Sequence, residues 1–315
     1  MAAFGRALIP GQTSVVYLHD IIDDDRITLW EDATQVVEAP NITSDGTWVV
    51  VNAQGRLHRL PLGAQVTHTG APRTGGGLEE IDTGTVHNAN NDHLVSPDGR
   101  FHYLTAGGEL YRVPWEGGPA TRVSPDTGGR AFRHYLHGIS PEGDNLSFVG
   151  LEGRLGSTDV IRTNVFTLDL ATGTITQLTD VDAPCDGSEW SPDGRTVYFN
   201  SELASTVPGH SQLFRVAGTG GEPEQLTFDE RVNWFPHVSP DGHWLAYVSY
   251  EPGTTQHPPN VPAQIRLLDL TDPRVGTPEL PVRVLADVFG GQGAMNVSSW
   301  HPDSRRLAYV DFPVA

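Results

Sequence analysis

The sequence predicts an all-β protein: a six-bladed β-propeller with four antiparallel strands per blade, occupying residues 1–315 as a single domain. Three observations predict this fold. A turn motif recurs six times, segments typical of β-strands flank each copy, and the strands missing from the last repeat are present at the start of the chain. The 35 glycines and 24 prolines indicate many tight turns rather than long helices.

The turn motif is Ser-Pro-Asp-Gly, with complete copies beginning at Ser96, Ser191 and Ser239. Degenerate copies begin at positions 43, 140 and 301, so successive copies are 44 to 62 residues apart. This period suits one four-stranded blade with its loops. Proline presets φ at the first corner, aspartate accepts a local backbone hydrogen bond, and glycine takes the left-handed position. We therefore place the motif between the first and second strands, A and B, of each blade.

The two ends of the chain complement each other. After the last motif copy, residues 306–310 form a predicted strand B, preceded by a predicted strand A at 296–300, and the sequence then stops. The first 35 residues contain two further strands, at 14–18 and 26–30, which match strands C and D. Pairing these strands closes the sixth blade and hides the edges that an open array would expose.

Composition excludes some partners. The net charge is −19, from 39 acidic and 20 basic residues. Such a surface repels phosphate groups, so we expect no nucleic-acid partner and no binding to a membrane surface. No run of about 18 apolar residues predicts a membrane span. The amino terminus lacks the features of a signal peptide and Cys185 is the only cysteine, which together favour a cytoplasmic location.

Candidate site residues lie just before the turn motifs, because strand A of each blade lines the central channel of a propeller. His93 and His137 lie three residues before the first motif residue, and Glu189 and His237 lie two before it. Three imidazoles and a carboxylate are suitable ligands for a divalent metal such as Mn, Zn or Ca, and the same groups can serve as acid and base. We predict His93, His137 and His237 as metal ligands, with Glu189 or Gln292 as the fourth.

Each histidine also has a structural interpretation, in which it bonds a channel water or a neighbouring carbonyl group. The long B–C loops of blades 3 to 5 lie on the same predicted face and add polar groups. Asp92 and Asp186 bind substrate or cap loops. The residues predicted to bind substrate are Asn91, Asp92, Asp186, Asn233, Asn296, Arg154, Arg162 and His257.

With its Ser-Pro-Asp-Gly turns, the chain resembles the TolB-like propellers over nearly its whole length. The segments at 90–93, 137–138, 233–237 and 289–293, each before a turn motif, resemble TolB-like proteins named as Tol biopolymer transport components. A more distant resemblance is to the oligogalacturonate lyases, propellers that bind a divalent metal, typically manganese, and cleave uronides by β-elimination. That resemblance implies metal-binding roles for four residues, His93, His137, His237 and Gln292.

Two functions follow from this sequence. The first is a metal-assisted enzyme of the lyase type that acts on a carbohydrate or polyol at the channel mouth. The alternative is a non-catalytic scaffold that binds a protein, a peptide or a small ligand on the same face. The sequence leaves open whether there is catalysis at all.

Overall fold

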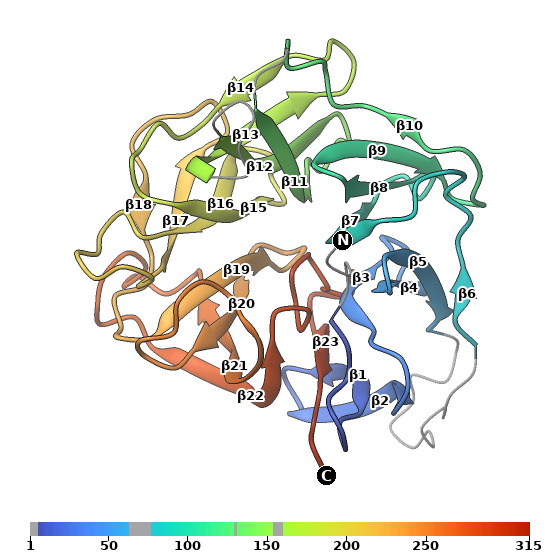
Figure 1. Cartoon of the computed structure of the whole chain (residues 1–315). Helices are drawn as coiled ribbons and strands as arrows, with labels where there is room; N and C mark the ends of the chain where they lie inside the picture. Colours follow the sequence, from blue (N-terminus) through green and yellow to red (C-terminus); the bar gives the residue numbers. More distant parts are fainter. Residues whose placement is uncertain (1–5, 63–76, 129–130, 154–159) are drawn as a thin grey trace.

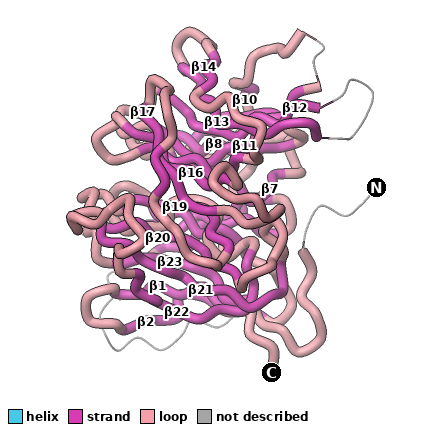
Figure 2. Tube along the Cα trace, turned by 90° about the vertical axis from the view of Figure 1, so that its left-hand side faces the viewer, coloured by secondary structure: helices cyan, strands magenta, loops and turns pink. Residues whose placement is uncertain are grey.

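The computed structural model describes residues 6–62, 77–128, 131–153 and 160–315. Six antiparallel sheets surround a central axis, with the first strand of each complete blade nearest the axis (Figure 1). The described part of the chain consists of strands, turns and loops (Figure 2). In that part, no helix has the length and apolar character needed to cross a bilayer.

Five blades have four strands each, in chain order from the axis outward. Blade 1 contains β3 (Glu38–Ile42), β4 (Trp48–Ala53), β5 (Arg56–Pro61) and β6 (Glu79–Glu80). Blade 2 contains β7 (Ala89–Val95), β8 (Phe101–Ala106), β9 (Glu109–Pro114) and β10 (Thr121–Arg122). Blade 3 contains β11 (Phe132–Ile139), β12 (Asn145–Gly153), β13 (Val160–Asp169) and β14 (Ile175–Gln177). Blade 4 contains β15 (Cys185–Trp190), β16 (Thr196–Ser201), β17 (Gln212–Ala217) and β18 (Glu224–Gln225). Blade 5 contains β19 (Val232–Val238), β20 (Trp244–Tyr250), β21 (Pro259–Asp269) and β22 (Val282–Gly291).

The sixth blade joins the two ends of the chain, as the sequence predicted. The strand β1 (Ser14–Asp20) pairs with β2 (Asp25–Asp32) on one side and with β23 (Arg306–Asp311) on the other. The prediction of a regular fourth strand at 296–300 is wrong. This segment contacts β23 through an isolated bridge between Trp300 and Leu307 and through single backbone hydrogen bonds from Ala308 to Ser299 and from Val310 to Ala294. Two glycines with positive φ, at 291 and 293, turn the chain just before it.

The turn motif forms the bonds that its residues predict. Ser96 Oγ donates a hydrogen bond to Asp98 Oδ1 at 2.6 Å and accepts one from the backbone N–H of Phe101 at 2.9 Å. Gly99 adopts a φ of 70°, which a residue with a Cβ rarely takes. The other two complete copies repeat both hydrogen bonds. A serine, an aspartate and a glycine therefore fix the A–B hairpin in each of these blades.

The hydrophobic core lies between neighbouring blades. One cluster joins Trp234, Val248 and Ile265 of blade 5 to Leu307 and Tyr309 of the sixth blade. Burying apolar side chains in this way favours the closed ring, because each blade covers a face of the next. The rigid ring in turn fixes where the starts of the first strands meet.

Candidate functional site

A cavity of about 370 Å³ lies at one mouth of the central channel. It lies on the predicted face, where the loops before the first strands meet the loops between the second and third strands. Eleven of its lining residues carry the argument below: Arg6, Glu38, Asn91, Asp92, Tyr135, His137, Asp186, Phe235, His257, Gln292 and Asn296.

One position of the repeat supplies five of these eleven side chains. The fifth residue before the turn motif lines the cavity in five of the six repeats, where it is Glu38, Asn91, Tyr135, Asp186 or Asn296. In blades 1, 2, 4 and 5 the pairing of the first two strands slips near this position. Such a bulge bends the strand and redirects its side chains. The bulges therefore mark the part of each first strand that borders the cavity.

His93 and His137 occupy the same register in the sequence but have different environments. The bulge of blade 3 lies between Leu136 and Gly138, so His137 is within it and lines the cavity. The bulge of blade 2 ends before His93, whose ring is fully buried with Nε2 3.3 Å from the carbonyl oxygen of Val50. Burial lowers the pKa of His93 to about 4, so the ring is neutral and joins blades 1 and 2.

The imidazole of His137 is protonated. Its Nε2 lies 3.0 Å from Asp186 Oδ1, and its Nδ1 lies 3.3 Å from the carbonyl oxygen of Asn296. Both partners are acceptors, so both ring nitrogens donate. Burial opposes the charge, but Asp92 and Asp186 outweigh it and raise the pKa of His137 to about 9. A fixed positive charge therefore lies at the base of the cavity.

The two aspartates beside His137 differ in their proton affinity. Burial raises the pKa of Asp92 to about 6, and the negative charge of Asp186 adds to the effect, while His137 opposes it. Asp186 is half-buried, and although desolvation opposes its charge, its hydrogen bond and ion pair with His137 lower its pKa below the usual value. Carboxyl groups separated in this way are typical of an acid and base pair in an active site.

Glu38 and Arg6 were missed by the sequence prediction. Glu38 is buried in the cavity wall, where burial raises its pKa to about 7 against the opposing effects of Arg6 and a hydrogen bond from Asn91. The signal that could have found Glu38 is its place five residues before the degenerate turn motif at 43, the position that Asn91, Asp186 and Asn296 occupy in their own repeats. Arg6 precedes every repeat, so no register could have placed it.

His257 was predicted from its loop and lies at the cavity wall. Its ring meets Trp234 and Phe235 edge to face, at centroid distances of 4.5 and 5.2 Å. Its Nε2 is 3.9 Å from Asp186 Oδ2, which is the second oxygen of the carboxylate that binds His137. Burial lowers the pKa of His257, so a neutral imidazole and an imidazolium flank one carboxylate.

Glu189 and His237 form a separate buried pair. The carboxylate of Glu189 bonds His237 Nδ1, and His237 Nε2 lies 3.3 Å from the carbonyl oxygen of Met295. Glu189 lines a different cavity of about 320 Å³, on the face of the turn motifs. His137 lines both cavities, so it marks the point where the two ends of the channel approach each other.

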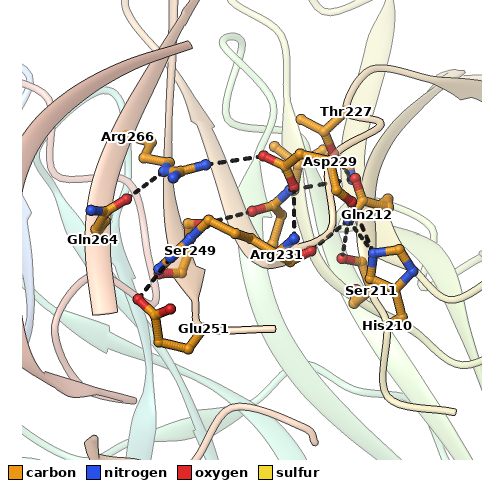
Figure 3. A network of polar contacts seen from close by, with 12 residues as sticks. His210, Ser211, Gln212, Thr227, Asp229, Arg231, Ser249, Glu251, Gln264 and Arg266 are labelled. Atoms are coloured by element: carbon orange, nitrogen blue, oxygen red, sulfur yellow. Dashed lines mark hydrogen bonds and ion pairs between the residues drawn. The ribbon is translucent and has the colours of Figure 1, made fainter. Parts of the chain in front are cut away.

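Asn233 lies within a polar network between blades 4 and 5, to which the residues in Figure 3 belong. Its side chain donates to Asp229 Oδ1 at 3.0 Å and accepts from Ser249 Oγ at 2.7 Å, and it is fully buried away from the cavity. Asp229 also accepts a hydrogen bond from Arg266 at 3.0 Å and one from the backbone N–H of Arg231 at 3.2 Å. The network gives Asn233 a structural role at this blade interface.

The remaining predicted residues divide clearly. Gln292, Asn91 and Asn296 line the cavity. Arg162 instead bonds Asp180 at 2.5 Å and is absent from the cavity lining. Arg154 lies outside the described residues.

The predicted metal ligands do not fit a shared ion. The ring nitrogens of His137 and His237 already face hydrogen-bond partners, and His93 points into the interface of blades 1 and 2. Among the described residues, no group of three or more histidine, cysteine, aspartate or glutamate side chains is arranged to hold a metal. The metal stays a prediction from the sequence, and no step below depends on it.

Comparison with known proteins gives the family. Residues 137–258 match the family model described as PD40, TolB beta propeller domain. The uncharacterized protein Atu1656 of Agrobacterium fabrum is 33% identical over 293 residues, which cover 91% of this chain and 88% of that protein. The chain belongs to the TolB-like PD40 β-propeller family.

Solved structures agree with this TolB-like assignment. A structure from Agrobacterium tumefaciens that is named for TolB has a TM-score of 0.81 and 30% identity, and the match covers 96% of this chain and 99% of that one. An oligogalacturonate lyase from Vibrio parahaemolyticus has a TM-score of 0.54 and 14% identity, over 89% of this chain and 74% of that one. The second likeness shows the fold alone.

Proposed function

We propose that this TolB-like propeller is an enzyme that binds a carbohydrate or polyol in the mouth cavity and acts on it by general acid–base catalysis. The observation that carries the proposal is the pair of carboxyl groups beside one imidazolium, buried Asp92 and half-buried Asp186, with their pKa values displaced in opposite directions. Nothing in a purely structural channel requires two neighbouring carboxyl groups to have such different pKa values.

The lining of the cavity favours a hydroxylated ligand. A volume of about 370 Å³ is suited to one small molecule. Amide groups of Asn91 and Gln292 and the carboxylates offer both donors and acceptors, which match the hydroxyl groups of a polyol. Tyr135, which is half-buried, adds a ring surface for the apolar face of a sugar. A protein partner with a flat surface would not reach these polar groups inside the cavity.

Asp92 is the residue that moves a proton. A carboxyl group with a pKa of about 6 changes its protonation near neutral pH, as a general acid or base must. Asp186 stays ionised and fixes His137, whose positive charge can stabilise negative charge developing on a ligand oxygen. Elimination of the lyase type needs a base that removes a proton from carbon, and Asp92 is placed to supply it.

The experiment is a ligand and turnover screen with matched variants. We expect neutral and acidic sugars at millimolar concentration to raise the melting temperature of the wild type, and mass spectrometry to detect a product from at least one of them. Asp92→Asn should abolish turnover and keep the binding affinity within about tenfold of the wild type. The variant loses the ionisable carboxyl group but has a side chain of the same size and shape. Asp126→Asn, an exposed loop position, is the control and should behave as the wild type.

The result also separates the alternatives. Binding without turnover in the wild type would leave a binding protein rather than an enzyme. No binding of any sugar, together with capture of a protein at this face that Tyr135→Glu abolishes, would favour the scaffold. Elemental analysis of the wild type and of His137→Ala tests the metal. Stoichiometric Mn, Zn or Ca that is lost in the variant would replace our proposal with a metal-assisted reaction.

A further inference from the structure

Arg6 lies across the rim of the mouth cavity, although it belongs to the segment before β1 (Ser14–Asp20). Its Nη1 donates to the carbonyl oxygen of Gln292 at 2.9 Å, and its Nη2 donates to Asn260 Oδ1 at 2.6 Å. The guanidinium also stacks on the ring of Phe312, with its central carbon 3.5 Å from the centroid. These contacts hold the side chain in one place over blades 5 and 6.

A second cavity of about 510 Å³ lies on the other side of Arg6. The segment 6–13 forms one wall, and residues from the loops after β2 and between β4 and β5 form the other. Three residues border both cavities: Arg6, Val36 and Gln54. The two cavities therefore meet at a boundary made of these three side chains.

The second cavity has the chemistry of a site for a neutral hydroxylated group. Apart from Arg6, its described lining contains no charged residue, whereas the mouth cavity contains Glu38 and two aspartates. Gln54 provides an exposed amide at the boundary, and Thr13 provides a hydroxyl group. The hydroxyl oxygen of Thr34 donates to Asp32 and retains a lone pair that accepts a hydrogen bond. A second polyol unit could bond such groups without an ionic partner.

We propose that the second cavity is a subsite for a further sugar or polyol unit, and that Arg6 is the specificity-determining residue that separates it from the mouth cavity. The inference rests on the proposed function, since it extends the same ligand class into the second cavity. With Arg6 in place, the protein takes a short ligand. Removing the Arg6 side chain joins the cavities into one cleft that accepts a longer chain of the same units.

We expect the fold to survive this change. The bonds of Arg6 are made by the tip of its side chain to partly buried groups. The segment is also held by Gln12, whose side chain bonds Asn260 at 2.9 Å and the carbonyl oxygen of Phe312 at 3.0 Å. Without Arg6, the nearby carboxyl group of Glu38 can take up a proton, so no unpaired charge stays buried.

The test measures binding of glucose oligomers of one to four units, joined by one linkage type, by isothermal titration calorimetry. The proteins are the wild type, Arg6→Ala, Arg6→Lys and the control Arg56→Ala, which alters a surface pair with Glu80. The quantity compared is the ratio of the affinity for the longest oligomer to the affinity for the shortest. We expect this ratio to be at least about tenfold higher in Arg6→Ala than in the wild type, because an added unit makes new contacts. The control should keep the wild-type preference, and Arg6→Lys should lie between.

An unchanged length preference in Arg6→Ala would overturn the inference while leaving the proposed function intact. If no oligomer binds any of the proteins, the proposed function fails for glucose units, and crystals soaked in tetraethylene glycol decide the inference alone. One glycol chain that runs through both cavities in Arg6→Ala, but not in the wild type, supports the boundary role. The same density in both proteins, or in neither, refutes it.

Discussion

The charge on His137 should make the stability of the protein fall as the solution becomes alkaline. In the folded protein the pKa of His137 is about 9, against an ordinary value of 6.5. A group whose pKa is raised by folding stabilises the folded state below its unfolded pKa, and this stability is lost as the pH rises through the folded value. At 1.36 kcal/mol per pKa unit, the difference corresponds to about 3 kcal/mol. The loss should fall between about pH 6.5 and 9.

Two buried carboxyl groups titrate at lower pH than His137. The pKa values of Asp92 and Glu38, at about 6 and about 7, are also raised, so their contribution is present at low pH and is lost as the pH rises through those values. The region from pH 8 to 9.5 therefore reports mainly on His137. The thiol of Cys185 has its pKa raised to about 11 by burial and does not titrate in that range.

The assay is urea unfolding, followed by tryptophan fluorescence at pH values from 6 to 9.5. His137 should account for about 3 kcal/mol of the unfolding free energy that the wild type loses over this range, and this part of the loss should be absent in His137→Gln. His243→Gln is the control, because His243 is largely exposed and should leave the pH dependence unchanged. Parallel curves for the wild type and His137→Gln would refute a protonated His137 in the folded state.

Three further predictions concern the ring itself. Asp229→Ala should lower the unfolding free energy by about 1 to 3 kcal/mol in urea, because Arg266 and the buried Asn233 lose a half-buried charged partner; a loss below about 0.5 kcal/mol would show that the network adds little. Gly138→Ala should cost more than Gly99→Ala in thermal unfolding, because a Cβ at 138 meets Ser147 Oγ and lies 2.9 Å from the backbone of Glu189, whereas a Cβ at 99 meets nothing and adds only the strain of a positive φ; equal losses would contradict the packing at 138. Cys185 should react with a thiol reagent only after unfolding, since it is buried and its pKa is raised; rapid labelling of the native protein would disprove this.

The repeat made the architecture readable from the sequence. The Ser-Pro-Asp-Gly turns carry their own bonding, so the blades and the closure by β1 and β23 could be predicted without any long-range information. The irregular fourth strand of the sixth blade could not be predicted, because it depends on how the glycines at 291 and 293 turn the chain.

The site was harder to predict than the ring. His93 and His137 occupy the same position relative to the turn motif, so the sequence predicted that they lie together. In the structure, only His137 lies within a bulge, and only His137 faces the cavity. Whether an imidazole is charged depends on partners from other blades, as with Asp186 beside His137. Arg6 shows the same limit, because its partners lie more than 250 positions further along the chain.

The opposite displacement of the two aspartates is tested most directly by NMR. Carboxyl carbons of ¹³C-labelled protein are followed from pH 2.5 to 8, and Asp92→Asn and Asp186→Asn assign the two signals. Our account predicts that Asp92 titrates near pH 6 and that Asp186 titrates below the ordinary aspartate value. Two signals that titrate together near pH 4 would contradict it.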